Sequence, residues 1–250
     1  MIYIKNKAAI EKMRIAGHKL AEIMIAVSEI LVPGISTLEI DRWIEGKMKF
    51  SGLVPVCKGY AGYRYATLIS LNDVVVHGIP SEKIVLKSGD FVKIDVVGGY
   101  RGYCADMARP YFIGEANVIA LQLAAVAQRA LDFAIECAVP LRHLSDLSAA
   151  IQAEVEAAGF GVVRDFAGHG IGKDLHEEPD IVNFGKAGEG PLLREGMTLA
   201  IEPMITEKEW NIVIMEDGWT AKTADGGLAA HVEDTIVITR DAPEILTRVG

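Results

Sequence analysis

Hydrophobic residues recur at every third or fourth position in the first part of the chain. Between residues 7 and 31 this spacing predicts a long amphipathic helix with one buried face, which Val32-Pro33-Gly34 ends. Ser36 and Glu39 have the spacing of a capping box, in which each side chain bonds a free backbone amide. A second helix is therefore predicted to begin at Ser36 and to end at Gly52.

After Gly52 the pattern changes to short apolar runs between glycine and turn residues, which is typical of strands. A third helix is predicted over residues 115–139, where alanine and leucine are frequent, and a fourth from a Ser145 cap to Gly159. Strands are predicted at Thr67–Leu71, Val74–Val76, Phe91–Val97, Val162–Phe166, Met197–Met204, Ile212–Met215 and Val232–Thr239.

The order of two helices followed by strands occurs twice, which suggests an internal repeat. A shift of 107 residues places Ile94-Asp95 on Ile201-Glu202 without a gap. We therefore predict one domain over residues 1–250, built from two α/β halves at roughly 7–112 and 115–240. The two halves would meet in the middle, where Asp95 and Glu202 approach from symmetric positions.

The composition suits a single folded domain, since 50% of the 250 residues are hydrophobic and the mean hydropathy is +0.25. A net charge of −9 without any basic run argues against a nucleic-acid groove. The N-terminal residues lack the apolar run of a signal peptide, and no stretch approaches the roughly 18 apolar residues that span a bilayer. Three widely spaced cysteines, Cys57, Cys104 and Cys137, indicate reduced thiols and a cytosolic location.

Two acidic residues lie in a predicted hairpin that carries the first candidate chemistry. Asp95 has β-branched neighbours on both sides, and a buried charge there is costly unless it is paired or bound to metal. If Gly99–Gly102 forms a four-residue loop, Asp95 faces Asp106 directly, with Cβ atoms roughly 4.5–5.5 Å apart. Carboxylates that close repel each other or share a cation. The alternative is a surface hairpin with Asp106 in solvent.

Two further acids, Glu202 and Glu233, also stand beside strand-forming apolar residues. Four acids on apolar strands are hard to explain without a shared positive charge. Glu233 has an alternative interpretation, because it shares one strand face with His231 and Thr235. A strand whose apolar residues alternate to the other face would expose it.

Three histidines stand in glycine-rich or turn contexts, namely His77, His169 and His176. His169 lies in a Gly-His-Gly-Ile-Gly stretch, where the missing side chains give the ring room and the backbone freedom. The spacing of seven between His169 and His176 is too long for a helical zinc pair, so these two residues more plausibly flank a loop and have different roles. The stretch lacks the lysine of a phosphate-binding loop. Each histidine taken alone would more often be structural.

Taken together, these residues resemble the type I methionine aminopeptidases. The markers, in chain order, are Val76–Pro80, Ile94–Val96, Ala105-Asp106, Gly168–Gly172, His176–Pro179, Ile201–Met204, Gly218–Thr220 and Glu233–Thr235. The resemblance extends from the first helix to Thr239. It implies an α+β fold of the pita-bread (creatinase/aminopeptidase) type, in which two pseudo-symmetric α/β halves form a curved antiparallel sheet covered by helices.

The resemblance also implies a dinuclear metal site in which Asp106 and Glu233 bridge. Its ligands are Asp95, Asp106, His169, Glu202 and Glu233. Four carboxylates and one imidazole favour Mn²⁺, Fe²⁺ or Co²⁺, with Zn²⁺ as a further option. We expect Glu202 to serve as general base, His176 to stabilise the oxyanion and His77 to hold the peptide beyond the cleaved bond.

Several apolar and aromatic residues are expected to wall a pocket for a methionine side chain, since soft sulfur and ring edges suit a thioether. They are Cys57, Tyr60, Tyr63, Leu68, Leu175 and Trp219. An ordinary core role for Cys57 and Leu68 is the alternative. Met107, Leu68 and Leu175 depart from residues frequent in the family, and the last two would line the pocket and bear on its shape.

The implied activity is removal of the N-terminal methionine from nascent proteins in the cytoplasm, by a monomeric enzyme that contacts no membrane. The resemblance also raises association with the ribosome. Two alternatives are a Xaa-Pro aminopeptidase or dipeptidase of the same fold, and a pita-bread protein that has lost its metal and acts as a binding module. The five intact ligand positions argue against the second alternative.

Overall fold

The computed structural model describes residues 1–249 and contains four α-helices within that range. They are α1 (Lys7–Ala26), α2 (Thr37–Phe50), α3 (Val118–Cys137) and α4 (Leu144–Ala157), with short 3₁₀ turns at Val27–Glu29 and Tyr60–Gly62. The strands are β1 (Val54–Pro55), β2 (Thr67–Leu71), β3 (Val74–Val76), β4 (Phe91–Tyr100), β5 (Tyr103–Phe112), β6 (Gly161–Val162), β7 (Ala167–Gly170), β8 (Glu177–Val182), β9 (Thr198–Ile201), β10 (Met204–Thr206), β11 (Ile212–Ile214), β12 (Ala221–Thr223), β13 (Ala229–His231), β14 (Glu233–Val237) and β15 (Glu244–Ile245).

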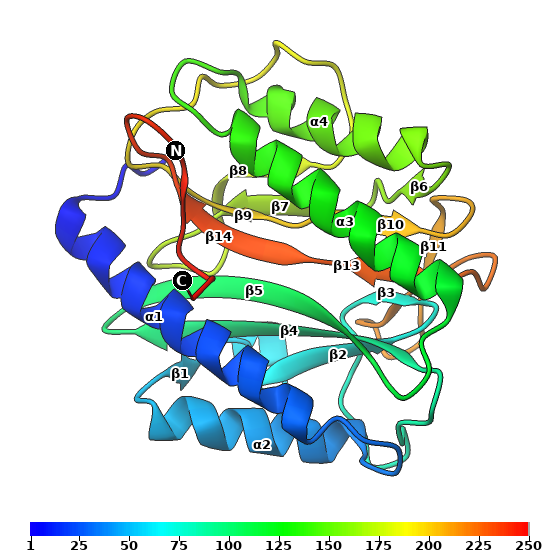
Figure 1. Cartoon of the computed structure of the whole chain (residues 1–250). Helices are drawn as coiled ribbons and strands as arrows, with labels where there is room; N and C mark the ends of the chain where they lie inside the picture. The colour runs from blue at the N-terminus through cyan, green and yellow to red at the C-terminus, as the bar shows by residue number, and fades with distance from the viewer. Residues whose placement is uncertain (250) are drawn as a thin grey trace.

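Residues 1–249 contain a nine-stranded antiparallel sheet. Its strand order is β1-β4-β5-β14-β9-β7-β8, and in addition β2 pairs with β4 and β15 pairs with β14. In Figure 1, α1 and α2 lie beside the strands of the first half, whereas α3 and α4 lie beside those of the second. Helix α1 packs on β4 and β5, α2 on β1 and β2, α3 on β13, and α4 on β6 and β8. The predicted α+β pita-bread fold is confirmed.

Two hydrophobic cores lie beneath the two helix pairs. One is centred on Leu20, Ile44 and Ile94 under α1 and α2, and the other on Leu131, Ile151 and Ile201 under α3 and α4. The acidic strand segments lie between these cores, where β5 of the first half pairs with β14 of the second. This pairing brings residues from both halves of the chain into one place.

The helix predictions are confirmed except at their ends. Ser36 accepts a hydrogen bond from the Glu39 amide at 3.3 Å, and Glu39 accepts one from the Ser36 amide at 2.9 Å, which completes the predicted capping box. The Ser145 cap is wrong. His143 is the N-cap of α4, and its amide donates to Asp146 at 3.2 Å. Ser145 lies inside the first turn of α4, where its hydroxyl accepts from the Glu189 amide, so it cannot be the cap.

Two predicted strands are interrupted. The predicted strand Val162–Phe166 is largely wrong, because β6 stops at Val162 and β7 begins at Ala167. The predicted strand Met197–Met204 divides at Glu202-Pro203 into β9 and β10, which belong to different sheets. Proline has no amide to donate to a ladder, so it favours a break there. The break frees Glu202 from regular pairing.

The register of the acidic hairpin differs from the prediction by two residues. Tyr100 pairs with Tyr103, so the loop is only Arg101-Gly102, and both of these residues have positive φ (48° and 78°), as a type I′ turn requires. Asp95 therefore lies opposite Ala108 rather than opposite Asp106. Because side chains alternate with a period of two, the shift still leaves both acids on one face of the sheet.

The internal repeat stays a prediction, which two isolated β-bridges support. Ser36 bridges to Val85, and His143 bridges to Leu192. His143 lies 107 positions after Ser36, and Leu192 lies 107 positions after Val85. The N-cap residues Ser36 and His143 lie at the same offset.

Helix α3 has the length and apolar composition of a membrane span, and within residues 1–249 no other helix meets these criteria. Its Leu123, Ala127, Ala130 and Leu131 are fully buried in the core beneath α3 and α4. Packing on the sheet thus accounts for much of its apolar surface.

Candidate active site

A cavity of about 310 Å³ opens where the two halves meet. It is lined by every residue for which the sequence predicted a role in the site: Cys57, Tyr60, Tyr63, Leu68, His77, Asp95, Asp106, His169, Leu175, His176, Glu202, Trp219 and Glu233. These residues come from strands and loops spread over most of the chain. Their convergence is a property of the fold that no single segment of the sequence contains.

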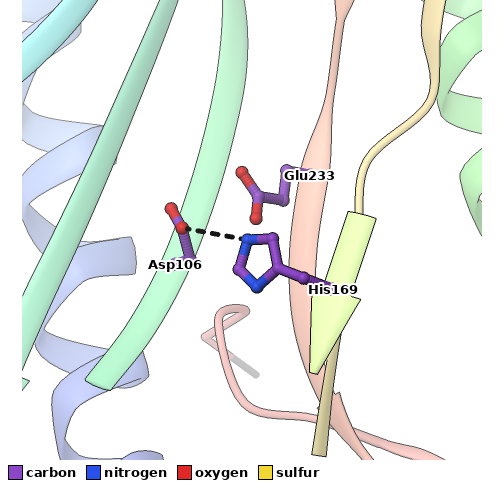
Figure 2. A group of neighbouring side chains, drawn as sticks. All are labelled: Asp106, His169 and Glu233. Carbon is purple, nitrogen blue, oxygen red and sulfur yellow. Dashed lines mark ion pairs between the residues drawn. The ribbon is translucent and has the colours of Figure 1, made fainter. Parts of the chain in front are cut away.

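Four acids and one histidine form the floor of the cavity. Asp95 lies on β4, Asp106 on β5, Glu233 begins β14, and Glu202 follows β9. His169 on β7 places its Nε2 atom 3.9 Å from Asp106 Oδ2 and 3.7 Å from Glu202 Oε1. Figure 2 shows the His169 ring directed toward the Asp106 carboxylate, with the Glu233 carboxylate beside both.

Both surface alternatives for these acids are wrong. Asp106 is 5% exposed and Glu233 is 2% exposed. Glu233 and its strand neighbours are buried on both faces of β14, with α3 packing nearby and the cavity on the other side. The alternation of polar and apolar residues along β14 therefore does not predict which of its side chains are exposed.

The carboxyl groups on the floor of the cavity resist ionisation, because burial and neighbouring acids destabilise their charged forms. Burial raises the pKa of Asp95 to about 7 and that of Glu202 to about 8. Burial and the neighbouring acids raise the pKa values of Asp106 and Glu233 well above their ordinary range. Asp95 Oδ1, Asp106 Oδ1 and Glu233 Oε1 are buried without a hydrogen-bond partner among the described residues. Such unpartnered acidic oxygens fit bound divalent cations.

Neighbouring groups hold the backbone of two of these acids and the ring of His169. The Thr235 hydroxyl accepts from the Asp106 amide and donates to the Asp106 carbonyl, both at 2.8 Å. The Asn183 amide donates to the Glu202 carbonyl at 3.0 Å. His169 Nδ1 lies 2.9 Å from the Gly170 carbonyl, so Nδ1 carries the hydrogen and the Nε2 lone pair faces the acids.

The glycines beside His169 are required by close packing. Neither Gly168 nor Gly170 has a positive φ, so backbone freedom is not what places them there. A Cβ atom on Gly168 would lie 2.5 Å from the Ala200 carbonyl oxygen, and one on Gly170 would lie 2.1 Å from the Glu178 oxygen. Strand β7 can lie between β8 and β9 only because these side chains are missing.

We expect the Gly170→Ala substitution to lower the free energy of unfolding by at least about 1–3 kcal/mol, because backbone rather than a flexible side chain must move. Denaturant unfolding would measure the change. The Gly46→Ala variant is the control, since Gly46 lies on the exposed face of α2 with open space around its Cβ position. It should stabilise the protein by about 0.5–1 kcal/mol. An unchanged midpoint for Gly170→Ala would contradict the packing explanation.

Two further histidines border the cavity above the acids. The His176 ring lies 4.3 Å from that of His169, and its Nδ1 lies 2.7 Å from the Tyr60 hydroxyl. His77 contacts Phe166, with ring centroids 5.1 Å apart. Burial lowers the pKa of His77 and of His169 to about 4, and it lowers the pKa of His176, so neutral imidazoles are favoured.

The turn at His77 explains the His-Gly pair in the sequence. His77 has a φ of 61°, a left-handed conformation that costs a side-chain-bearing residue about 1–3 kcal/mol. A Cβ atom on Gly78 would lie 2.1 Å from the Ile69 carbonyl oxygen. The chain therefore passes close against β2, and this approach turns His77 toward the cavity.

Sequence reasoning missed several residues of this region. Val97, Phe166, Ala167 and Met204 also line the cavity. His231 ends β13, and its Nε2 lies 3.2 Å from Glu202 Oε2. The available signal for His231 is its place on one strand face with Glu233. The predicted free thiols are confirmed, since Cys57, Cys104 and Cys137 form no disulfide.

The model of the metallopeptidase family M24 matches residues 11–240. The chain belongs to metallopeptidase family M24. This M24 chain is 43% identical to methionine aminopeptidase A of Synechocystis sp., over 98% of its own length and 97% of that protein. The crystal structure of methionine aminopeptidase from Thermotoga maritima superposes with a TM-score of 0.98 at 44% identity, covering all of both chains. The prolidase from Pyrococcus furiosus gives 0.80 at 25% identity, covering 99% of this chain and 66% of the prolidase.

Membership in family M24, together with the buried acidic cluster, makes this chain a metal-dependent hydrolase. Its fit to the methionine aminopeptidases is closer than its fit to the prolidase, both in identity and in superposition. The acids and His169 form the floor of its cavity, and apolar residues form the walls.

Proposed function

We propose that the protein is a type I methionine aminopeptidase, which hydrolyses the first peptide bond of chains that begin with methionine. The observation that carries this proposal is the cavity, in which a buried acidic floor adjoins a small apolar pocket. The similarity to methionine aminopeptidases over the full chain supports the same conclusion. A binding module without metal would have no reason to keep four acids buried together.

We propose two divalent ions, which Asp95, Asp106, His169, Glu202 and Glu233 would hold. An oxygen-rich set of this kind suits Mn²⁺, Fe²⁺ or Co²⁺, with Zn²⁺ as a further option. When bound, such ions would act as Lewis acids and lower the pKa of a water molecule to near neutral.

Glu202 would move the proton in this reaction. Glu202 lies next to the break at Pro203 and lines the cavity, where a carboxylate can accept a proton from a water molecule in the cavity. In the proposed mechanism Glu202 takes a proton from the attacking water and passes it to the leaving amine. The rest of the site positions the peptide for that transfer.

His176 and His77 would bind the peptide backbone. If the Tyr60 hydroxyl donates to His176 Nδ1, then Nε2 keeps its hydrogen and can donate to the oxyanion that forms on the carbonyl oxygen. His77 lines the cavity beside Phe166 and Trp219, and we assign it to the part of the peptide that follows the cleaved bond.

The methionine side chain would enter the apolar part of the cavity. Its walls include Cys57, Tyr63, Leu68, Leu175 and Trp219, and the rings of Tyr63 and Trp219 pack with centroids 4.9 Å apart. Thioether sulfur makes favourable contacts with ring edges. Leu68 and Leu175 set the depth of this pocket, and they would determine which side chains other than methionine are accepted.

The cellular setting is part of the proposal. Three free cysteines support a reducing compartment, and we propose that the enzyme acts in the cytoplasm on nascent chains. That the enzyme is a monomer and associates with ribosomes is an expectation from the family resemblance.

Peptide cleavage tests the proposed activity. We expect Met-Ala-Ser to be cleaved after methionine, cleavage to stop on removal of metal by a chelator, and added Mn²⁺ or Co²⁺ to restore it. The control substrate is Ala-Pro, which a Xaa-Pro peptidase of the same fold would cleave. Preferred cleavage of Ala-Pro would favour that alternative, and chelator-insensitive cleavage of Met-Ala-Ser would contradict the metal-dependent mechanism.

A further inference from the structure

His231 is a buried histidine for which the five-ligand interpretation has no use. It lies at the end of β13, is 2% exposed, and pairs across the strands with Met204. Its Nε2 is 3.2 Å from Glu202 Oε2, yet it is not aligned for a hydrogen bond. Nε2 therefore has no hydrogen-bond partner among residues 1–249. An unpartnered ring nitrogen directed at a carboxylate cluster requires an explanation.

The acids and histidines of the floor form two groups with the geometry of ion sites. One contains Asp106, His169 and Glu233, and the other contains Glu202, His231 and Glu233. Within each group the possible ligand atoms all lie within 4.8 Å of one another. Atoms that bind one ion at about 2.0–2.3 Å are at most about twice that distance apart, so small rotations bring either group into contact with an ion.

The two groups share Glu233, and each has one imidazole and one further carboxylate. Neighbouring ions in hydrolases are commonly bridged by a carboxylate in this way. His169 and His231 enter from different strands, β7 and β13, on either side of the acids. The arrangement is therefore that of two adjacent sites, each with its own nitrogen donor.

We propose that His231 is a metal ligand and that each of the two ions has one imidazole. The inference rests on the proposed dinuclear function, and it changes the ligand set from five residues to six. A neutral imidazole offers one ring nitrogen with a lone pair to a cation, and Nε2 of His231 is the ring nitrogen that faces Glu202. The added nitrogen makes the second ion site softer, which favours Fe²⁺, Co²⁺ or Zn²⁺ over Mn²⁺ there.

Metal binding to the purified protein tests the inference without reference to turnover. The apo protein and the His231→Gln variant are titrated with Co²⁺ under anaerobic conditions by calorimetry, and bound ions are counted by elemental analysis. The wild type should bind two ions. The variant should bind its second ion at least about 10- to 100-fold more weakly, since even partners of ligands contribute that much. His18→Gln on the exposed face of α1 is the matched control and should bind as the wild type does.

X-ray absorption of the Co²⁺-loaded wild type supplies a second measurement that does not depend on the folding of a variant. If two imidazoles bind two ions, the average number of imidazoles per ion is one. If His169 is the only imidazole ligand, the average is one half. An average of one half, or equal affinities in the wild type and His231→Gln, would overturn the assignment of His231 while leaving the proposed function intact. A wild type that binds no divalent ion would overturn both.

Discussion

The Glu202→Gln variant is expected to lose turnover of Met-Ala-Ser by about 10²- to 10⁴-fold, the range that general acid–base catalysis contributes. The amide is nearly isosteric with the carboxylate but cannot accept the proton from the attacking water. The Asn183 hydrogen bond goes to the backbone carbonyl of residue 202, so the local fold should persist. Steady-state kinetics of the metal-loaded proteins would measure the loss in kcat.

Two comparisons separate proton transfer from loss of metal. The variant is assayed at rising Co²⁺ concentration together with a count of its bound ions, because Glu202 is also a proposed ligand. Glu209→Gln, an exposed glutamate a few residues further along, is the control and should retain full activity. A Glu202→Gln enzyme with near wild-type kcat would remove Glu202 from the proton transfer.

The metal-free protein should lose stability as the pH rises from about 6.5 to 9. The folded-state pKa values of Asp95 and Glu202, about 7 and about 8, exceed the ordinary values of 3.8 and 4.5. The folded state therefore holds protons that the unfolded state has released, and the free energy of unfolding falls with pH until these groups ionise. For these two acids the loss is on the order of a few kcal/mol, and Asp106 and Glu233 act in the same direction.

The pH window matters because the buried histidines oppose this trend at lower pH. His77, His169 and His231 have pKa values of about 4 in the folded state, against 6.5 ordinarily. Their contribution to stability is lost as the pH falls below about 6.5, so only data above that value isolate the acids.

Thermal unfolding of the chelator-treated protein between pH 6.5 and 9 would measure the effect. Added Mn²⁺ or Co²⁺ should raise the melting temperature most at the alkaline end, where the acids are charged and repel one another. The apo Asp95→Asn variant should be more stable than the apo wild type at pH 8.5, because one charge is removed. If the stability of the metal-free wild type rises between pH 6.5 and 9, the proposed repulsion among the buried acids is contradicted.

The sequence predicted the acidic cluster because a charge among β-branched residues is hard to place elsewhere. Asp95, Glu202 and Glu233 are each identified as candidates from their strand neighbours, and all three line one cavity. The specific set of pocket walls came from the resemblance to a family, because no local pattern distinguishes Leu68 from an ordinary core residue.

What the sequence could not predict depended on contacts between distant segments. The hairpin register was missed because Arg101, which is not a glycine, adopts the positive φ of a two-residue turn. The Ser145 cap is wrong because His143, which forms a β-bridge with the distant Leu192, is the N-cap of α4. His231 was assigned no role from the sequence, and the alternation that would expose Glu233 on the same strand face indicates exposure only where one sheet face meets solvent, whereas here both faces are covered.

The junction between β5 and β14 has a further consequence. Only two residue pairs form this part of the ladder, Glu233 with Ala108 and Asp234 with Met107. Asp95 and Asp106 lie on one side of it, and His169 and Glu202 on the other. Ions bound by residues of both halves would therefore hold the halves together. Loss of the ions would weaken the contact between the cavity walls that surround the substrate. Metal supply would then govern the shape of the cavity as well as the reaction in it.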